Sequence, residues 1–285
     1  MGDTAHRELN WGDILLRLSL CNWIDMRAKP TQSPATVSPR RNELLAAIPR
    51  ESWVNVFPAL ERVALPSGKV LYEPGHEFTH VYFPIDSIIA LLGVTQTGFS
   101  TRIAVVGKEG LLGAPLFMGS ESTSSRAIVQ FGGHAFRIPA ALAKGEFVRH
   151  GMMISLVLRY IQVLITQMAQ TAVCNRHHCV DQQLCRWLLE TVDRLPSNSF
   201  TITQELIGRM LGVRRESVTD AAGKLQELGV ISYSRGFITV LDRARLENLS
   251  CECYRVVRRE TDRLIGFYSA AQIAIKQVRH YRYRF

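Results

Sequence analysis

The chain has 285 residues and carries 34 Lys and Arg against 25 Asp and Glu, so it is long enough for two domains with separate cores and has a formal net charge of +9. Most of this charge falls in residues 176–285, which favours a polyanionic partner, although a modest positive charge is also common in proteins that bind nothing acidic. The six cysteines lack the spacing of a disulfide framework and no secretory signal pattern is present, which excludes a secreted scaffold. No run reaches about 18 uninterrupted apolar residues, which argues against a membrane span. We therefore expect a cytoplasmic protein.

The N-terminal segment predicts no folded domain. Residues 29–41 are rich in proline and polar side chains, so residues 1–41 are predicted to be a flexible N-terminal extension. Within it, residues 11–23 could form a short amphipathic helix for a partner or could equally be flexible. Residues 42–60 predict short helices that lead into the next segment.

Short β-rich runs between glycines follow. Their spacing is typical of a β-barrel or β-roll, which we place at residues 42–148 as a sensor domain with a helical exit at 139–147. The predicted strands are 70–72, 81–83, 88–94, 101–106, 127–131 and 135–138.

Residues 151–175 predict a long helix that is apolar on nearly all sides. Such a helix must be covered on more than one side, by the roll and by the same helix of a second chain, so we place a dimerisation helix at residues 149–178. The alternative is the central core helix of a monomer. The residues spaced for a two-helix seam are Ile154, Leu158, Ile161, Ile165, Met168 and Ala172.

A tract with Cys174, His177, His178 and Cys179 ends this helix. Cys174 and His178 share one helical face and could hold a metal or haem iron, but the favoured interpretation is a helix junction, so no metal site is predicted. Cys251 and Cys253 add thiols, although a Cys-x-Cys pair on a helix points to two different faces. A redox-responsive thiol is a further alternative.

Residues 203–225 predict a helix-turn-helix. Gly212 supplies the turn between two apolar helical faces, and the small residues Gly208 and Ala221 permit a close approach of the helices. Polar residues remain outward on the second helix, where they could reach base edges and phosphates in a major groove. The alternative is an ordinary helical hairpin with a solvated polar face.

A β-hairpin after this motif makes the DNA-binding interpretation the favoured one. Residues 230–233 and 237–241 alternate as two strands, with Arg235 at the tip, so the pattern is that of a winged helix. Asp242 is the predicted N-cap of one further helix over residues 243–268. The winged helix-turn-helix therefore takes residues 179–268, and residues 269–285 form a basic, aromatic tail that could grip nucleic acid or be disordered.

This order of elements, an α+β architecture, resembles the Crp/Fnr family of transcription regulators over about residues 42–241. The motifs that carry the likeness are residues 69–75, which look like the opening of a cyclic-nucleotide-binding-type roll, and residues 202–218, which look like the family's recognition motif. The resemblance implies double-stranded DNA as the partner, a homodimer through the 151–175 helix, and RNA polymerase as a further partner.

The resemblance also implies which side chains meet DNA. Arg215 would read guanine and Glu216 the amino group of cytosine, with Thr219 beside them. Asp220 stands where catabolite activators carry a second base-reading arginine, so their DNA consensus is not expected to transfer. The expected phosphate or register contacts are Thr203, Arg214, Ser217, Lys224 and Arg235.

The expected effector site departs from that of cAMP-binding relatives. Ala114 and Pro115 stand where those relatives carry a ribose-binding Glu, and Arg126 is one position away from their phosphate-binding Arg. A shift of one residue on a strand sends the side chain to the opposite face, so control by cAMP is not expected. Arg126, together with Ala114 and Ser125, is the best candidate for the effector pocket, although Arg126 could simply be a solvent-facing strand residue.

Two other chemistries are not expected. The oxygen-sensing branch of the family holds an iron–sulfur cluster with several N-terminal cysteines, and here only Cys21 lies there. No catalytic constellation predicts an enzyme. The alternative function is a ligand-sensing or protein-interaction module whose helix-turn-helix does not read DNA, because Glu216 and Asp220 place acidic groups on its outer face.

Overall fold

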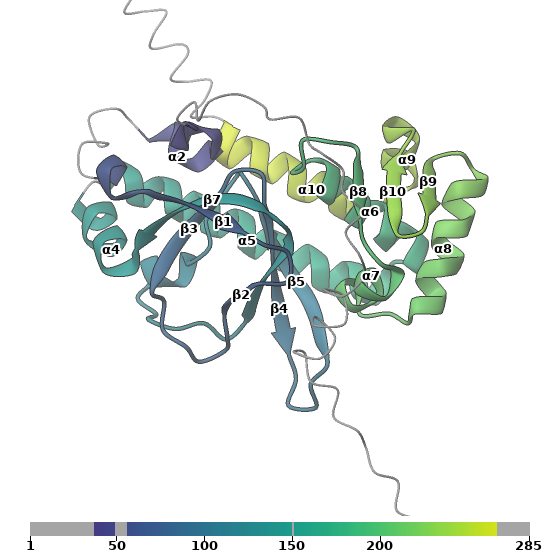
Figure 1. The fold of residues 1–285 in the computed structure, drawn as a ribbon, viewed down its shortest axis with the longest axis horizontal. Coiled ribbons are helices and arrows are strands. Elements are labelled where there is room, and N and C mark those ends of the chain that lie inside the picture. Colours follow the sequence, from purple (N-terminus) through teal and green to yellow (C-terminus); the bar gives the residue numbers. More distant parts are fainter. Residues whose placement is uncertain (1–36, 49–55, 150, 267–285) are drawn as a thin grey trace, which may run out of the picture. The chain divides into compact units, whose positions relative to one another are not determined.

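The computed structural model describes residues 37–48, 56–149 and 151–266 of the chain (Figure 1). Contacts divide the chain after Val37, and the fold below is that of the unit Ser38–Phe285. Most of the predicted N-terminal extension, including the expected helix at 11–23, lies outside the described residues. The predicted basic tail at 269–285 also lies outside them.

The N-terminal part is a roll of two antiparallel sheets, with strand orders β1-β7-β3 and β2-β6-β4-β5. The second sheet is buried along most of β4, where Ala90 pairs with Ile128 of β6 and with Val105 of β5. The strands and short helices of the roll are η1 (Pro39–Arg41), α2 (Glu43–Ala47), η3 (Phe57–Ala59), β1 (Glu61–Leu65), β2 (Val70–Tyr72), β3 (His80–Pro84), β4 (Ile88–Val94), β5 (Ser100–Val106), η4 (Ala114–Met118), β6 (Arg126–Phe131) and β7 (Gly133–Pro139). The predicted β-roll and α+β class are confirmed.

Strand β1 was not predicted. Its residues are mostly exposed, so they lack the apolar alternation that marks a half-buried strand. Its position follows instead from backbone pairing with β7, in which Val63 faces Ala135.

Two helices follow the roll, α4 (Ala140–Arg149) and α5 (Gly151–His177). In Figure 1, α5 passes behind the strands and leads to the C-terminal module. Its inner face is buried on the roll, and Gln167 Oε1 accepts a hydrogen bond from the Val105 backbone N–H at 2.5 Å. Among the described helices, α5 alone is long and apolar enough to cross a membrane, and 44% of its most apolar window is buried in the protein.

The C-terminal module is a helix-turn-helix with a three-stranded wing of order β8-β10-β9. Strand β8 was not predicted, because three residues are too short for a periodic signal and only their pairing with β10 makes them a strand. The elements are α6 (Val180–Val192), β8 (Ser199–Thr201), α7 (Gln204–Leu211), α8 (Arg215–Glu227), β9 (Ile231–Ser234), β10 (Phe237–Val240), α9 (Arg243–Leu249), α10 (Glu252–Thr261) and the π-helical turn η5 (Asp262–Gly266).

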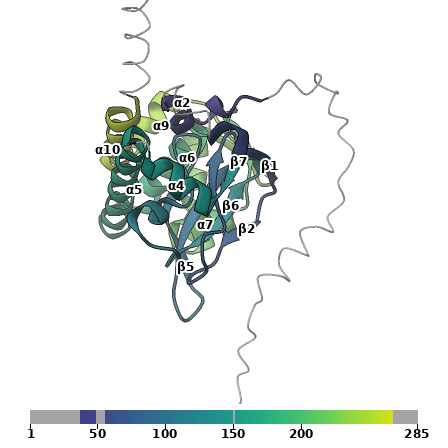
Figure 2. The same cartoon turned by 90° about the vertical axis from the view of Figure 1, so that its left-hand side faces the viewer.

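The single helix predicted at 243–268 is wrong. Asp242 does cap α9, since its side chain accepts a hydrogen bond from the Arg245 N–H at 2.9 Å, but Ser250 and Cys251 adopt extended backbone angles and separate α9 from α10. This break turns the chain so that α10 packs against α5, as Figure 2 also shows.

One cluster of buried side chains continues from the roll into the C-terminal module, which differs from the two separate cores expected. Phe131 of β6, Trp187 of α6 and Phe200 of β8 form an aromatic group with ring centroids 5.3–6.3 Å apart. Aromatic pairs at such separations add to the stabilisation from burial. The module is therefore packed firmly on the roll of its own chain.

Candidate nucleic-acid interface

The first helix of the motif ends at the predicted turn, and a side-chain cap marks its beginning. Thr203 is the N-cap of α7, and its hydroxyl accepts a hydrogen bond from the Leu206 N–H at 3.2 Å. Gly212 ends the helix with φ of +71°, a left-handed conformation that favours glycine. Gly208 lets the turn lie against α7, because a Cβ there would be only 2.9 Å from the Val213 carbonyl oxygen.

The second helix presents a polar face to solvent. Val218, Ala221, Ala222 and Leu225 of α8 are buried, whereas the predicted base readers Arg215, Glu216 and Thr219 are all exposed. Arg214 is the N-cap without a side-chain capping bond, so its guanidinium is not used to cap the helix. The exposed face therefore begins at the N-terminal end of α8, the end that enters the major groove in helix-turn-helix proteins.

Two predicted contact residues are also tied to neighbouring helices. The Thr219 hydroxyl donates to Gln204 Oε1 of α7 at 2.8 Å and so joins the two helices of the motif. Lys224 points to α6, where its ammonium group pairs with Asp181 at 2.9 Å. That hydrogen bond raises the pKa of Lys224.

The wing borders a groove beside α8. Arg235 and Gly236 form the hairpin tip with φ of 49° and 82°, the positive angles of a tight two-residue turn. A hollow of about 460 Å³ lies between wing and motif, and the predicted Thr203, Arg215 and Arg235 all line it. Tyr233 forms another wall: burial raises its pKa, so its hydroxyl stays a donor, and it bonds to the Ile202 carbonyl at 3.1 Å.

Buried charges hold α6, which carries the motif, against the roll and α5. Glu190 of α6 accepts from Arg102 of β5 at 2.6 Å and from Arg186 at 2.8 Å, and all three side chains are more than 90% buried. Arg194 extends the group to Glu109 of the roll at 2.8 Å. Burial opposes ionisation of Glu190, but the surrounding guanidinium groups outweigh it and lower the pKa to about 2.

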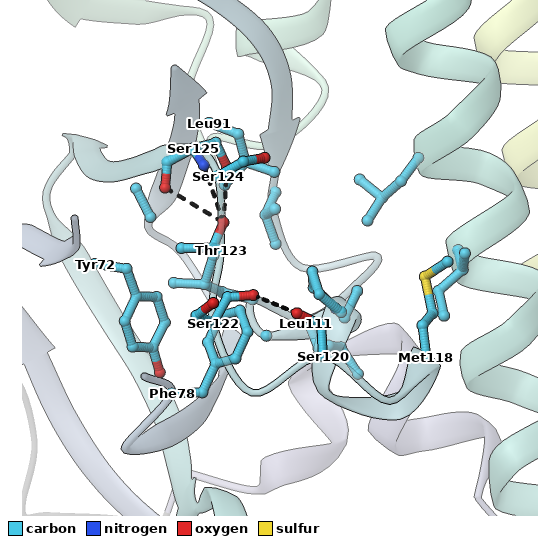
Figure 3. Close-up of a pocket in the computed structure, with 18 of the residues that line it drawn as sticks. Tyr72, Phe78, Leu91, Leu111, Met118, Ser120, Ser122, Thr123, Ser124 and Ser125 are labelled. Atoms are coloured by element: carbon cyan, nitrogen blue, oxygen red, sulfur yellow. Dashed lines mark hydrogen bonds between the residues drawn. The ribbon is translucent and has the colours of Figure 1, made fainter. Parts of the chain in front are cut away.

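The roll encloses a second candidate site, an apolar cavity of about 670 Å³ between its strands and α5 (Figure 3). The lining includes the predicted Ala114 and Ser125, and all of the described residues that line it are uncharged. Figure 3 shows Tyr72 and Phe78 on one side of the space and Met118 on the other.

Arg126 is not among the residues that line this cavity. Its Nε donates to Glu73 Oε2 of the neighbouring segment at 2.8 Å. Hydroxyl groups give the cavity its polarity, and they are partly engaged with each other: Thr123 Oγ1 and Ser125 Oγ lie 3.0 Å apart. The cavity thus offers a ligand apolar walls and a few hydroxyls.

Helix α5 divides the predicted seam between two surfaces. Ile161 is buried and lines the cavity together with Met168, so it faces the roll and not a second chain. Leu158 and Ile165 are 51% and 50% exposed, and Ala172 is also exposed. Of these three, Ile165 also lines the cavity, so it lies where the two surfaces meet. An apolar stripe is therefore open on the outer side of the helix.

The cysteine and histidine tract lies at the junction between α5 and α6, and its residues divide between solvent and the protein interior. His177 and Cys179 are exposed, whereas Cys174 and His178 meet Cys251 and Cys253 of the C-terminal helix. The prediction that Cys251 and Cys253 point to different faces is wrong because Cys251 is the extended N-cap of α10 and lies outside its helical turns.

Comparisons with known proteins agree with this architecture. The family model of the Crp-like helix-turn-helix domain matches residues 182–249. A search of curated proteins finds no match to the chain.

Solved structures show the same fold over most of the chain. A Crp/Fnr-family protein from Eubacterium rectale is 18% identical, with 74% of this chain and 98% of that chain covered and a TM-score of 0.59. FixK2 from Bradyrhizobium japonicum is 14% identical, with coverages of 67% and 98% and a TM-score of 0.59. The c-di-GMP-responsive global regulator CLP from Xanthomonas campestris is 13% identical, with coverages of 68% and 100% and a TM-score of 0.54.

Proposed function

The chain combines a Crp-like helix-turn-helix domain with the fold of the Crp/Fnr transcription regulators, and on that premise we propose that it is a sequence-specific DNA-binding regulator that acts in the cytoplasm as a homodimer on an inverted repeat. The observation that carries the proposal is the solvent-exposed N-terminal half of α8 beside the groove bounded by Arg215 and Arg235. Contact with RNA polymerase would follow from binding at a promoter.

The residues of this interface fall into two groups, those proposed to contact bases and those proposed to contact phosphates or to fix the register. Arg215, Glu216 and Thr219 face the bases, since they lie exposed at the N-terminal end of α8. The proposed phosphate and register contacts are Thr203, Arg214, Ser217, Lys224 and Arg235. Among these, Lys224 acts on register, because its pairing with Asp181 ties α8 to α6.

The exposed stripe of α5 supports the dimer. Leu158, Ile165 and Ala172 lie at intervals of seven residues, which keeps them on one side of a helix that pairs with its own copy. A two-fold axis along α5 would present two recognition helices to half-sites about 34–36 Å apart. One motif by itself buries too little surface for a tight specific site.

The cavity in the roll is the proposed effector site, and cAMP is not its ligand. A cyclic phosphate carries a negative charge that needs a cation or several N–H donors when it leaves water. The described lining supplies no charged group, and Arg126 is paired with Glu73 outside the lining. Its walls suit an apolar molecule with a few hydrogen-bonding groups.

Selection of duplex DNA by the purified protein without ligand, at near-physiological salt, tests the proposal. We expect an enriched inverted repeat, and we expect Arg215→Ala to bind it roughly 5- to 150-fold more weakly, equivalent to about 1–3 kcal/mol. Arg62→Ala, an exposed arginine on β1, is the matched control and should bind normally.

Other outcomes would change the assignment. Enrichment only with cAMP would overturn the absence of cAMP control. A lack of enrichment with cyclic nucleotides, metals and either redox condition would favour the protein-interaction alternative. The acidic Glu216 and Asp220 on the outer face of α8 are consistent with that alternative.

A further inference from the structure

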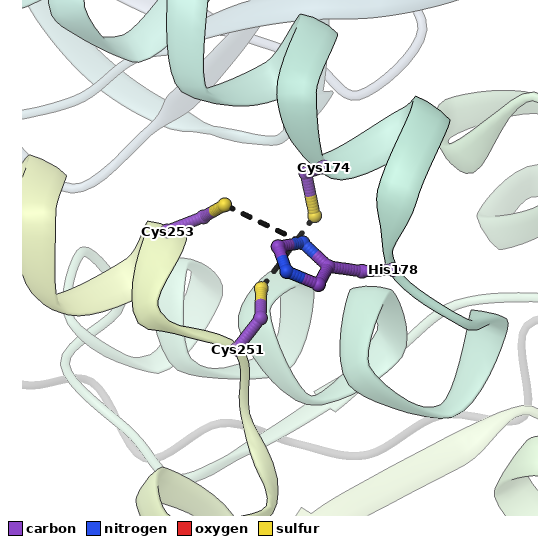
Figure 4. A group of neighbouring side chains, drawn as sticks. All are labelled: Cys174, His178, Cys251 and Cys253. Atoms are coloured by element: carbon purple, nitrogen blue, oxygen red, sulfur yellow. Dashed lines mark hydrogen bonds between the residues drawn. The ribbon is translucent and has the colours of Figure 1, made fainter.

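Four side chains suited to a metal ion meet where α5 ends and α10 begins (Figure 4). Cys174 lies in the last turn of α5 and His178 directly follows that helix, whereas Cys251 and Cys253 come from the N-cap and first turn of α10. The three Sγ atoms and the imidazole nitrogen all lie within 4.8 Å of one another. The three cysteines are at most 3% exposed, so the group is shielded from solvent.

Two of the separations between these atoms match the edges of a small tetrahedron. Cys174 Sγ lies 3.6 Å from Cys251 Sγ, and Cys253 Sγ lies 3.5 Å from His178 Nδ1. In a tetrahedral zinc site with Zn–S of about 2.3 Å and Zn–N of about 2.0–2.1 Å, the sulfurs are about 3.8 Å apart and sulfur and nitrogen about 3.6 Å. Both observed separations agree with these values within about 0.2 Å.

The surroundings orient the ligands as in known metal sites. His178 turns Nδ1 toward the sulfurs and places Nε2 3.3 Å from Glu252 Oε1, the outer carboxylate that commonly fixes a metal-binding imidazole. Gln183 Nε2 donates to the carbonyl oxygens of His178 and Cys174 at 2.9 and 3.4 Å and so holds the turn between them.

Charge also favours an ion at this position. Three thiolates and one divalent cation leave one negative charge in a buried place. The guanidinium of Arg186, which also pairs with Glu190, lies beside Cys174 and offsets part of that charge. Its other hydrogen bonds go to the Gln170 carbonyl oxygen and the Thr171 hydroxyl. A site with four protein ligands has no open position for a substrate, which is typical of structural zinc.

We propose that Cys174, His178, Cys251 and Cys253 bind one structural Zn²⁺ ion. The ion joins the C-terminal end of α5 to the N-terminal end of α10. Of its ligands, Cys174 and Cys251 are 77 positions apart in the sequence. Because α6 follows α5 immediately, the ion fixes the point from which the DNA-binding module leaves the long helix. Zinc binding at this site does not depend on the proposed DNA binding.

Metal analysis of the full-length protein, purified under reducing conditions, tests the site directly. We expect about one zinc per chain, and Co²⁺ added to the metal-free protein should produce the intense ligand-field bands of a tetrahedral sulfur-rich site. Chelation should lower the melting temperature of the wild-type protein. These measurements need no variant, so they decide the question even if a ligand substitution prevents folding.

Matched substitutions locate the ion. His178→Ala and Cys253→Ala should lose zinc, whereas His177→Ala and Cys179→Ser, on exposed neighbours in the same tract, should keep it. Glu252→Ala should bind zinc with an affinity lower by about 10- to 100-fold, since it removes the partner of the imidazole.

The proposal is overturned by protein that contains no zinc and gives no Co²⁺ bands. Iron in place of zinc would also overturn it. Equal zinc content in the His178→Ala and His177→Ala proteins would place the ion elsewhere in the chain.

Discussion

Replacing Glu190 by Gln should destabilise the protein strongly, because this carboxylate is the anion between two buried guanidinium groups. Glu190 is 4% exposed and accepts hydrogen bonds from Arg102 at 2.6 Å and Arg186 at 2.8 Å. The glutamine has nearly the same shape but no charge. It therefore leaves Arg102 and Arg186 buried without this carboxylate.

The magnitude follows from the two bonds. Hydrogen bonds to charged groups contribute about 1.5–3 kcal/mol each, which gives about 3–6 kcal/mol for the pair. Removal of one partner from a buried ion pair costs about 3–5 kcal/mol in other proteins, in the same range. At a urea m-value of about 3 kcal/mol/M, a loss of about 4 kcal/mol lowers the unfolding midpoint by roughly 1.3 M.

Urea unfolding followed by circular dichroism and by tryptophan fluorescence, to which the buried Trp187 one turn from Glu190 contributes, measures this change. Glu227→Gln on the exposed face of α8 is the control, and its midpoint should stay within the error of the wild type. A Glu190→Gln midpoint equal to that of the control would refute the reasoning. It would mean that water or backbone movement satisfies both guanidinium groups.

Three further predictions concern pH, helix contact and assembly. The pKa of Glu190 is about 2 in the fold against 4.5 in an unfolded chain, so its stabilisation of about 3 kcal/mol is present above pH 4.5 and is lost as pH falls toward 2. The urea midpoint of the wild type should therefore fall more steeply over this pH range than that of Glu190→Gln. Parallel curves for the two proteins would contradict this. Gly208→Val should lower the melting temperature, because a Cβ at this position meets the Val213 carbonyl oxygen at 2.9 Å. Gly223→Ala, in open space, should stabilise the protein by up to about 1 kcal/mol through its higher helix propensity. Stabilisation by both substitutions would exclude the close contact at Gly208. Leu158→Glu with Ala172→Glu, at two exposed positions of α5 that do not line the cavity, should shift the protein to monomer in sedimentation. Phe99→Glu on an exposed turn between β4 and β5 should leave the dimer intact, and an unchanged dimer in the α5 variant would rule out this face of the helix.

Local signals predicted the parts of the candidate site that lie close together in the chain. The turn at Gly212 and the apolar faces of α7 and α8 are set by residues within about two helical turns, so periodicity and the position of glycine identify them. The hairpin around Arg235 is local for the same reason.

Pairings between distant segments were decided only by the tertiary structure. Strands β1 and β8 have no apolar pattern of their own and exist because β7 and β10 pair with them. Arg102 and Glu190 are 88 positions apart, and their contact depends on how α6 packs on β5.

The cysteine group also depends partly on local sequence and partly on tertiary structure. Cys174 and His178 share a helical face by their spacing, so the sequence by itself determined half of the proposed zinc site. The other half required the extended backbone at Ser250 and Cys251, which ends one helix and starts the next, and the packing of α10 on α5. Long-range packing selects one arrangement among many that the local sequence permits, because the free energy that favours it comes from contacts between segments and not from any segment alone.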